Sequence, residues 1–75
     1  MTKKDYELIA QTYAKEVARL ETKIADYKAK GFEQSRDHHY SKLLELKCFA
    51  IDLADALAEA NPRFDKRKFI KTCGL

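Results

Sequence analysis

The stretch NPRFDKRKFIKTCGL, residues 61–75, decides how many helices this chain forms. Pro62 disfavours α geometry in the residue before it, so a preceding helix is predicted to end near Asn61. Asp65 then has a side chain that can accept hydrogen bonds from the first amides of a new helix. The sequence therefore predicts a short third helix over about residues 66–73.

Two phenylalanines in this stretch support a helix start at Asp65. With Asp65 as the N-cap, Phe64 precedes the cap and Phe69 is the fourth helical residue, and side chains at these positions pack together as a hydrophobic staple. A competing start has Asn61 as the cap and Pro62 as the first helical residue, where proline is also favourable. The sequence alone leaves both starts open.

A first long helix is predicted over about residues 3–30. Thr2 and Asp5 form a weak capping box at its start, and Gly31 suits the left-handed conformation that ends many helices. Its apolar residues recur every three or four positions. They are Tyr6, Ile9, Ala10, Tyr13, Val17, Leu20, Ile24 and Tyr27. We expect the tyrosines to be half-buried in a helix–helix seam rather than to form a stacking platform for bases.

A second long helix, over about residues 35–60, carries a broad apolar stripe. One row of this stripe is Leu43, Leu46, Ala50, Leu53, Leu57 and Ala60. A second row is Leu44, Cys48, Ile51, Ala54 and Ala58. The carboxylates Asp52, Asp55 and Glu59 are expected on the solvated polar side. A stripe this broad is typical of a helix that contacts more than one neighbour.

These elements predict a single all-α domain over residues 1–75, in which a short C-terminal helix follows a long antiparallel helical hairpin. Each long helix would span about 39 Å, which is more than a helix of ten residues can cover. Apolar surface should therefore stay exposed. We expect either a homodimer, with the Leu43–Leu57 row or the Leu44–Ala58 row packed against its own copy, or a groove for another protein.

Composition narrows the class of protein. Two cysteines among 75 residues do not make a disulfide framework, and no signal-like pattern is present, so we expect a reducing, cytoplasmic location. No apolar stretch approaches the roughly 20 residues that cross a bilayer, so we expect no membrane insertion. Cys48 is expected to be a buried thiol. Cys73 is either more exposed or a packing residue beneath the last turn.

The sequence offers little catalytic chemistry. Neighbouring His38 and His39 would diverge by about 100° on a helix, so they do not converge on one zinc ion. We interpret both as polar residues of the second helix, with a pH-sensitive contact as the functional alternative. There is no glycine-rich phosphate loop and no HExxH pattern. We therefore expect no enzyme activity, no metal and no cofactor.

Basic residues are concentrated in the last fifteen positions. Residues 1–60 hold ten Lys/Arg against eleven Asp/Glu, whereas residues 61–75 hold five against Asp65 alone, a local charge of +4. The five are our candidate partner-binding residues: Arg63, Lys66, Arg67, Lys68 and Lys71. Basic side chains around Phe69 are what a phosphate-binding helix offers, and a solvated helix end is the alternative.

Two blocks of the sequence form a recognisable pattern. The first is Lys-Lys-Asp-Tyr at residues 3–6 with Leu-Ile-Ala at residues 8–10. The second comprises Leu53, Ala54 and Leu57, then Asn-Pro-Arg-Phe-Asp at residues 61–65, then Lys68, Phe69, Cys73 and Gly74. This pattern resembles a loose group of short proteins encoded by bacteriophages, plasmids and integrated elements. The resemblance covers both ends of the chain and not its middle.

The resemblance implies a habitat rather than an activity. Small proteins of mobile elements often act by binding one host macromolecule. We expect a helical interaction protein that binds and modulates or inhibits a host protein, such as a defence component in an anti-CRISPR role. One alternative is a nucleic-acid-binding accessory protein that uses the basic C-terminal helix. Another is a structural component of a phage or plasmid complex.

Overall fold

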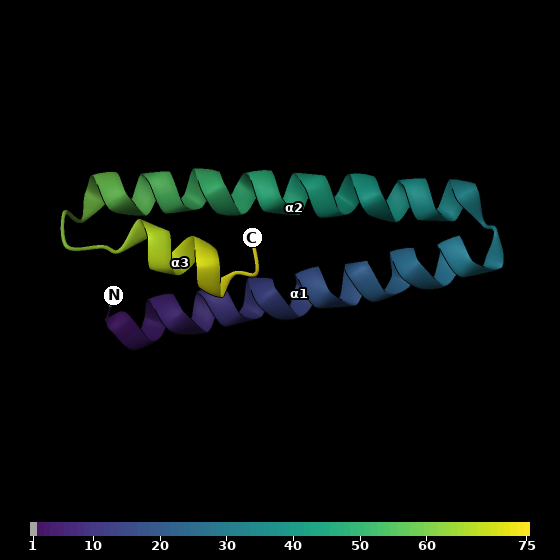
Figure 1. Cartoon of the computed structure of the whole chain (residues 1–75). Coiled ribbons are helices and arrows are strands. Elements are labelled where there is room, and N and C mark those ends of the chain that lie inside the picture. The colour runs from purple at the N-terminus through teal and green to yellow at the C-terminus, as the bar shows by residue number, and fades with distance from the viewer. Residues whose placement is uncertain (1) are drawn as a thin grey trace.

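The structure is a computed structural model that describes residues 2–75, and this range contains three α-helices. α1 spans Lys3–Lys30, α2 spans Glu33–Ala60 and α3 spans Lys66–Thr72. The two long helices lie side by side and antiparallel, and α3 folds back between them at the end of the hairpin away from its connecting loop (Figure 1). No strand occurs in the described range. The predicted all-α hairpin with a short third helix is thereby confirmed.

The first helix begins and ends at the predicted signals. The backbone N–H of Thr2 donates to Asp5 Oδ2 at 2.8 Å, and the N–H of Asp5 donates to the Thr2 hydroxyl at 3.3 Å. The Thr2 hydroxyl also donates to Asp5 Oδ2, at 3.1 Å, and the bonds that Asp5 Oδ2 accepts, first from the Thr2 amide and then from its hydroxyl, lower the pKa of the Asp5 carboxyl. Gly31 has φ 75° and its N–H donates to the Lys28 carbonyl at 3.2 Å, so it ends α1 in the left-handed conformation.

The second helix begins at Glu33, two residues earlier than predicted. Because Gly31 reverses the chain direction at once, Phe32 already serves as the N-cap, and its carbonyl accepts the Arg36 N–H at 3.0 Å. The Phe32 side chain remains exposed, with its ring 6.4 Å from that of Tyr27. The loop between α1 and α2 therefore consists of two residues, which holds the long helices close together.

The third helix starts at Asp65, one of the two starts that the sequence left open. The Lys68 N–H donates to Asp65 Oδ1 at 3.0 Å, and the rings of Phe64 and Phe69 lie 5.3 Å apart as a staple. The Asn61 side chain serves the preceding turn instead, where its Oδ1 accepts the Arg63 N–H at 3.1 Å. Helix α3 ends at Thr72, one residue earlier than predicted.

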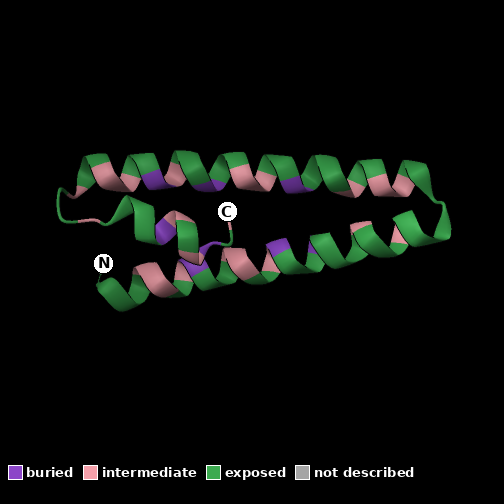
Figure 2. Ribbon diagram, viewed as in Figure 1, coloured by how far each residue is buried: buried purple, intermediate pink, exposed green. Residues whose placement is uncertain are grey.

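The core divides into two clusters along the hairpin. Where three helices meet, Ala10, Ala54, Phe69 and Cys73 are buried together. Farther toward the loop, between α1 and α2, the cluster is Val17, Leu20 and Leu43, and Leu75 after α3 also packs against it. The small alanines let α3 approach both long helices closely. Figure 2 shows the buried positions on the sides of the helices that face one another, with exposed residues elsewhere.

Cys48 is exposed, so the prediction that it is a buried thiol was wrong. Cys48 lies about 200° around α2 from the buried Ala50, and α1 and α3 together cover only one side of this helix. The buried thiol is Cys73, which has no exposed surface. Burial of this kind raises the pKa of the Cys73 thiol.

The broad stripe of α2 is split by the fold. From its first row, Leu43 and Ala50 are buried within the chain, so that row as a whole is not available to a second copy. From its second row, Ala54 is buried whereas Leu44 and Ile51 are exposed. Neither row is therefore a continuous outer surface, because α3 crosses the stripe near Ala54.

Candidate interaction surface

A groove of about 430 Å³ lies between the first turns of α1 and the start of α3. Its apolar lining comes from Tyr6 and Ala10 of α1, from Phe64 and from Phe69. The rings of Tyr6 and Phe64 meet edge to face with centroids 4.8 Å apart, which stabilises this wall of the groove. The Asn61 Nδ2 donates to the Tyr6 hydroxyl at 3.4 Å and so ties the loop before α3 to α1.

The charged side chains of this groove are mainly basic. Lys3 of α1, Arg63 of the loop and Lys68 of α3 all line it and are exposed. The acidic side chains that line it are Glu7 and Asp65, and one oxygen of Asp65 is already engaged by the Lys68 amide. We call this feature the α1–α3 groove. The groove has an apolar floor, and three cationic side chains lie around its rim.

The structure separates the five predicted partner-binding residues. Arg63 and Lys68 line the α1–α3 groove. Lys66 instead extends toward α2, where its ammonium pairs with the Asp55 carboxylate. Arg67 and Lys71 are exposed on α3 and do not line the groove. The five predicted residues therefore lie in three places, namely the groove, the contact with α2 and the outer surface of α3, and they do not form one continuous patch.

The contribution of α1 to the groove was missed at the level of sequence. Lys3, Tyr6 and Ala10 are far from residues 61–75 along the chain, and the fold brings them alongside α3. Their spacing of three and four residues does place them on one side of a helix, which was the available signal. Asp55 is likewise no purely solvated carboxylate, since it pairs with Lys66.

The remaining candidates are arranged as follows. His39 is half-buried, its Nδ1 lies 2.8 Å from the Ser35 carbonyl oxygen, and its ring lies 5.0 Å from that of Tyr27. His38 is exposed beside it. Within residues 2–75 no three His, Cys, Asp or Glu side chains converge as metal ligands. The predicted seam tyrosines Tyr6, Tyr13 and Tyr27 are half-buried.

No helix in the described range is both long enough and apolar enough to cross a bilayer. Comparison of the chain with protein-family models, with curated proteins and with solved structures gives no match.

Proposed function

We propose that this chain is a protein-binding module that acts by occupying part of a partner's surface and carries out no reaction of its own. The observation that carries the proposal is the α1–α3 groove, in which Lys3, Arg63 and Lys68 surround a floor of aromatic side chains. Arg and aromatic residues are the groups that most often dominate the energy of a protein interface. Lys3 and Lys68 are held by the capped first turns of α1 and α3, and Arg63 follows from the loop between α2 and α3.

The chemistry of the groove suggests the chemistry of its occupant. Three cations outnumber the two carboxylates, Glu7 and Asp65, so the groove favours a segment that carries Asp or Glu. The apolar floor built from Tyr6, Phe64 and Phe69 favours one large apolar side chain within that segment. The resemblance to proteins of phages and plasmids implies that the partner is a bacterial host protein. A defence component, such as a CRISPR effector, belongs to that class, and binding there would modulate or inhibit it.

Nucleic acid is the alternative ligand, and the same exposed cations support it. Binding along a phosphate backbone works best with a continuous basic track. Here Lys66 pairs with Asp55, and Arg67 and Lys71 lie outside the groove that holds Arg63 and Lys68. We therefore favour a protein partner.

Affinity capture from nuclease-treated bacterial lysate tests this proposal. The groove variant Arg63→Glu/Lys68→Glu reverses two cations of the rim. The control Lys23→Glu/Lys28→Glu makes the same change of charge on α1, away from the groove. We expect a protein that wild type and control retain and that the groove variant loses. A partner retained equally by the groove variant would contradict the assignment of the groove.

A titration with mixed DNA and RNA at low salt separates the two ligand classes. We expect at most weak binding that disappears as the salt concentration is raised, because the basic side chains lie on different surfaces and do not form one track. Submicromolar binding at physiological salt that is abolished by Arg63→Glu/Lys68→Glu, with no protein partner captured, would replace the protein-binding proposal with the nucleic-acid one.

A further inference from the structure

A second apolar surface lies on the side of the hairpin away from α3. We call it the hairpin face, and its exposed apolar residues are Leu8 of α1 and Phe49 of α2. The half-buried Ile9, Tyr13 and Leu46 adjoin them, and their inner sides also pack against the core. Leu8 lies about 200° around α1 from Ala10, and Phe49 about 140° around α2 from Ala54, the two alanines beneath α3. Leu8 is 64% exposed and Phe49 is 61% exposed, more than any other large apolar residue in the described range.

The two helices present this face together. The rings of Tyr13 and Phe49 lie 6.4 Å apart across the hairpin. Beside them is an open groove of about 630 Å³ lined by Leu8, Ile9 and Leu46 together with neighbouring polar residues of α1. A surface built on both helices offers a four-helix arrangement to any partner that is itself a hairpin.

The chain exposes more surface than a compact monomer of its mass, and this excess is close to the area that each partner buries in a dimer of standard size. The chain exposes 5607 Å², whereas a compact monomer of 8.7 kDa is expected to expose about 4,700 Å². The excess of about 900 Å² per chain is close to the roughly 800 Å² that each partner buries in a standard interface. It arises from the elongated shape, 46 × 18 × 15 Å, in which one short helix covers one side of a long hairpin.

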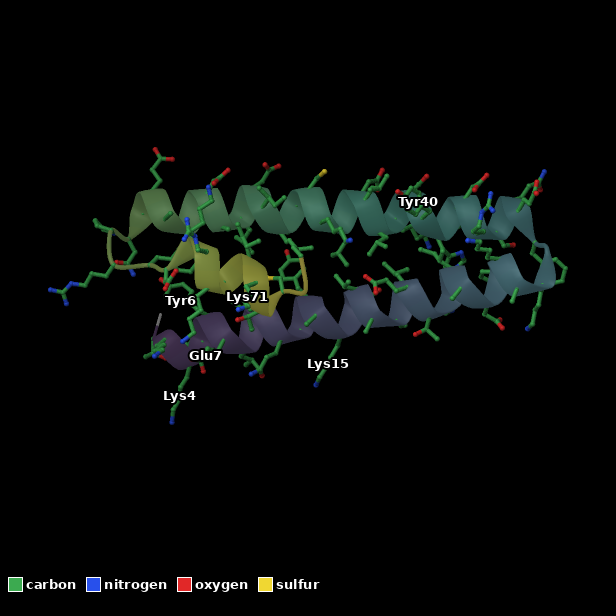
Figure 3. All side chains as sticks on the ribbon, in the orientation of Figure 1. Lys4, Tyr6, Glu7, Lys15, Tyr40 and Lys71 are labelled. Atoms are coloured by element: carbon green, nitrogen blue, oxygen red, sulfur yellow. The ribbon has the colours of Figure 1, made fainter. Side chains whose placement is uncertain are left out.

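The charges along the outer edges of the hairpin face select one pairing. On α1, Lys4 and Lys15 point away from α2 (Figure 3). On α2, the exposed charged residues along the corresponding edge are mainly acidic, Glu45, Asp52 and Glu59, with Lys42 as the basic exception. Glu16 and Arg19 of α1 also line the groove on this face and pair with one another. When two hairpins stack face to face with α1 over α2 of the other copy, the basic edge of each meets the acidic edge of its partner. The alternative, with α1 over α1, brings basic edges together and is disfavoured.

We propose that a second copy of this chain covers the hairpin face, so that α1 of each copy packs antiparallel on α2 of the other as a symmetric four-helix bundle. Tyr13 stands level with Phe49, so Lys15 stands level with the part of α2 between Glu45 and Asp52. Lys15 therefore meets those two carboxylates of the second copy. The α1–α3 groove lies on the opposite side of each hairpin and stays open, so the dimer presents two such grooves.

Size-exclusion chromatography with light scattering, at protein concentrations from low micromolar to submillimolar, measures the molar mass and so shows whether two chains associate. We expect the mass of two chains for the wild type. Phe49→Glu should weaken the dimer at least tenfold while its circular dichroism stays helical, because a charge replaces an apolar side chain at the centre of the interface. Leu8→Glu is a second variant at a still more exposed position. The matched control is Ile51→Glu, at an exposed apolar residue of α2 outside the hairpin face, which should remain dimeric.

Charge exchange tests the orientation. Lys15→Glu should weaken the dimer, and adding Glu45→Lys and Asp52→Lys to it should restore the pairing. A single-chain mass at every concentration would overturn the proposal, as would a dimer that Ile51→Glu dissociates and that both Phe49→Glu and Leu8→Glu leave intact. A dimer that Lys15→Glu weakens and that the compensating pair does not restore would overturn the pairing of α1 with α2.

Discussion

At the scale of single residues, Asp65 determines where α3 begins. Its carboxylate accepts the Lys68 amide hydrogen, which would otherwise have no partner at the start of the helix. Lys66 and Lys68 lie in the same first turn, where positive charge is unfavourable to the helix dipole, so the cap offsets a cost as well as satisfying an amide. Asp65 therefore acts mainly as a hydrogen-bond acceptor, and its negative charge contributes less.

This role predicts a specific contrast between two substitutions. Asp65→Ala removes the acceptor and should lower the free energy of unfolding by about 1 kcal/mol. Asp65→Asn keeps an acceptor of similar capping strength and should stay within a few tenths of a kcal/mol of wild type. Urea unfolding of the wild type and the two variants, all at the same protein concentration, measures both changes in the free energy of unfolding. An equal loss for Ala and Asn would mean that Asp65 acts through its charge rather than as a cap.

The two cysteines differ in exposure, and their chemistry should differ with it. Cys48 is exposed on α2, whereas Cys73 is fully buried against α1 and α2 and the burial raises the pKa of its thiol. The reactive species is the thiolate, so Cys73 is protected both by its neighbours and by its low ionisation. Because its proton is held more tightly in the folded state, the contribution of Cys73 to stability is lost as pH rises above about 9.

A thiol-modifying reagent such as DTNB measures this difference at neutral pH. We expect one thiol per chain to react at the rate of an exposed cysteine and the other only as fast as the fold opens. In Cys48→Ser the fast reaction should vanish, and in urea both thiols of the wild type should react quickly. A fast-reacting Cys73 in folded Cys48→Ser would contradict its place in the core.

At the scale of the elements, the two-residue loop after α1 sets how the hairpin forms. Gly31 has φ 75°, and a Cβ added there would meet no atom within 4 Å. A substitution at this position therefore costs backbone strain and no steric clash. Since residues other than glycine disfavour this conformation, with asparagine the most tolerant, the position separates residue types by conformation alone.

Gly31→Ala is accordingly expected to lower the free energy of unfolding by about 1 kcal/mol. Gly31→Asn should lower it by less, and both variants should retain the three helices. Thermal unfolding followed by circular dichroism compares them. Wild-type stability in Gly31→Ala would show that the loop does not require the left-handed conformation.

The predictability of these elements depended on whether their signals were local. The capping box of Thr2, the left-handed Gly31, the cap at Asp65 and the stop near Pro62 each act over a few residues, so the sequence predicted the three helices closely. The side of α2 that α3 covers depends on packing among all three helices. Cys48 was therefore misplaced, because periodicity describes a stripe and not which part of it finds a neighbour.

The candidate site was predictable only in part for the same reason. Arg63 and Lys68 were identified from the local excess of charge, and the fold puts both in one groove. Lys3 and Tyr6 complete that groove from the opposite end of the chain, and Asp55 removes Lys66 from it. Contacts between residues far apart in sequence carry no local signature in a single chain.

At the scale of the whole molecule, the elongated shape explains both proposals. The radius of gyration is 14.3 Å, against about 11 Å for a compact domain of this length. α3 covers one side of the hairpin near its open end and forms the α1–α3 groove there, while the hairpin face on the other side remains uncovered. The two surfaces are separate, so a dimer through one leaves the other free for a different protein.

The central claim is that the α1–α3 groove binds a protein, and site-specific photo-crosslinking in living bacteria tests it most directly. A photoreactive phenylalanine analogue replaces Arg63 at the groove or, as the control, Lys28 on α1 away from it. We predict a discrete, nuclease-resistant adduct heavier than two copies of this chain from position 63 and not from position 28. Adducts of equal pattern from both positions, or adducts from position 63 that nuclease removes, would contradict the claim.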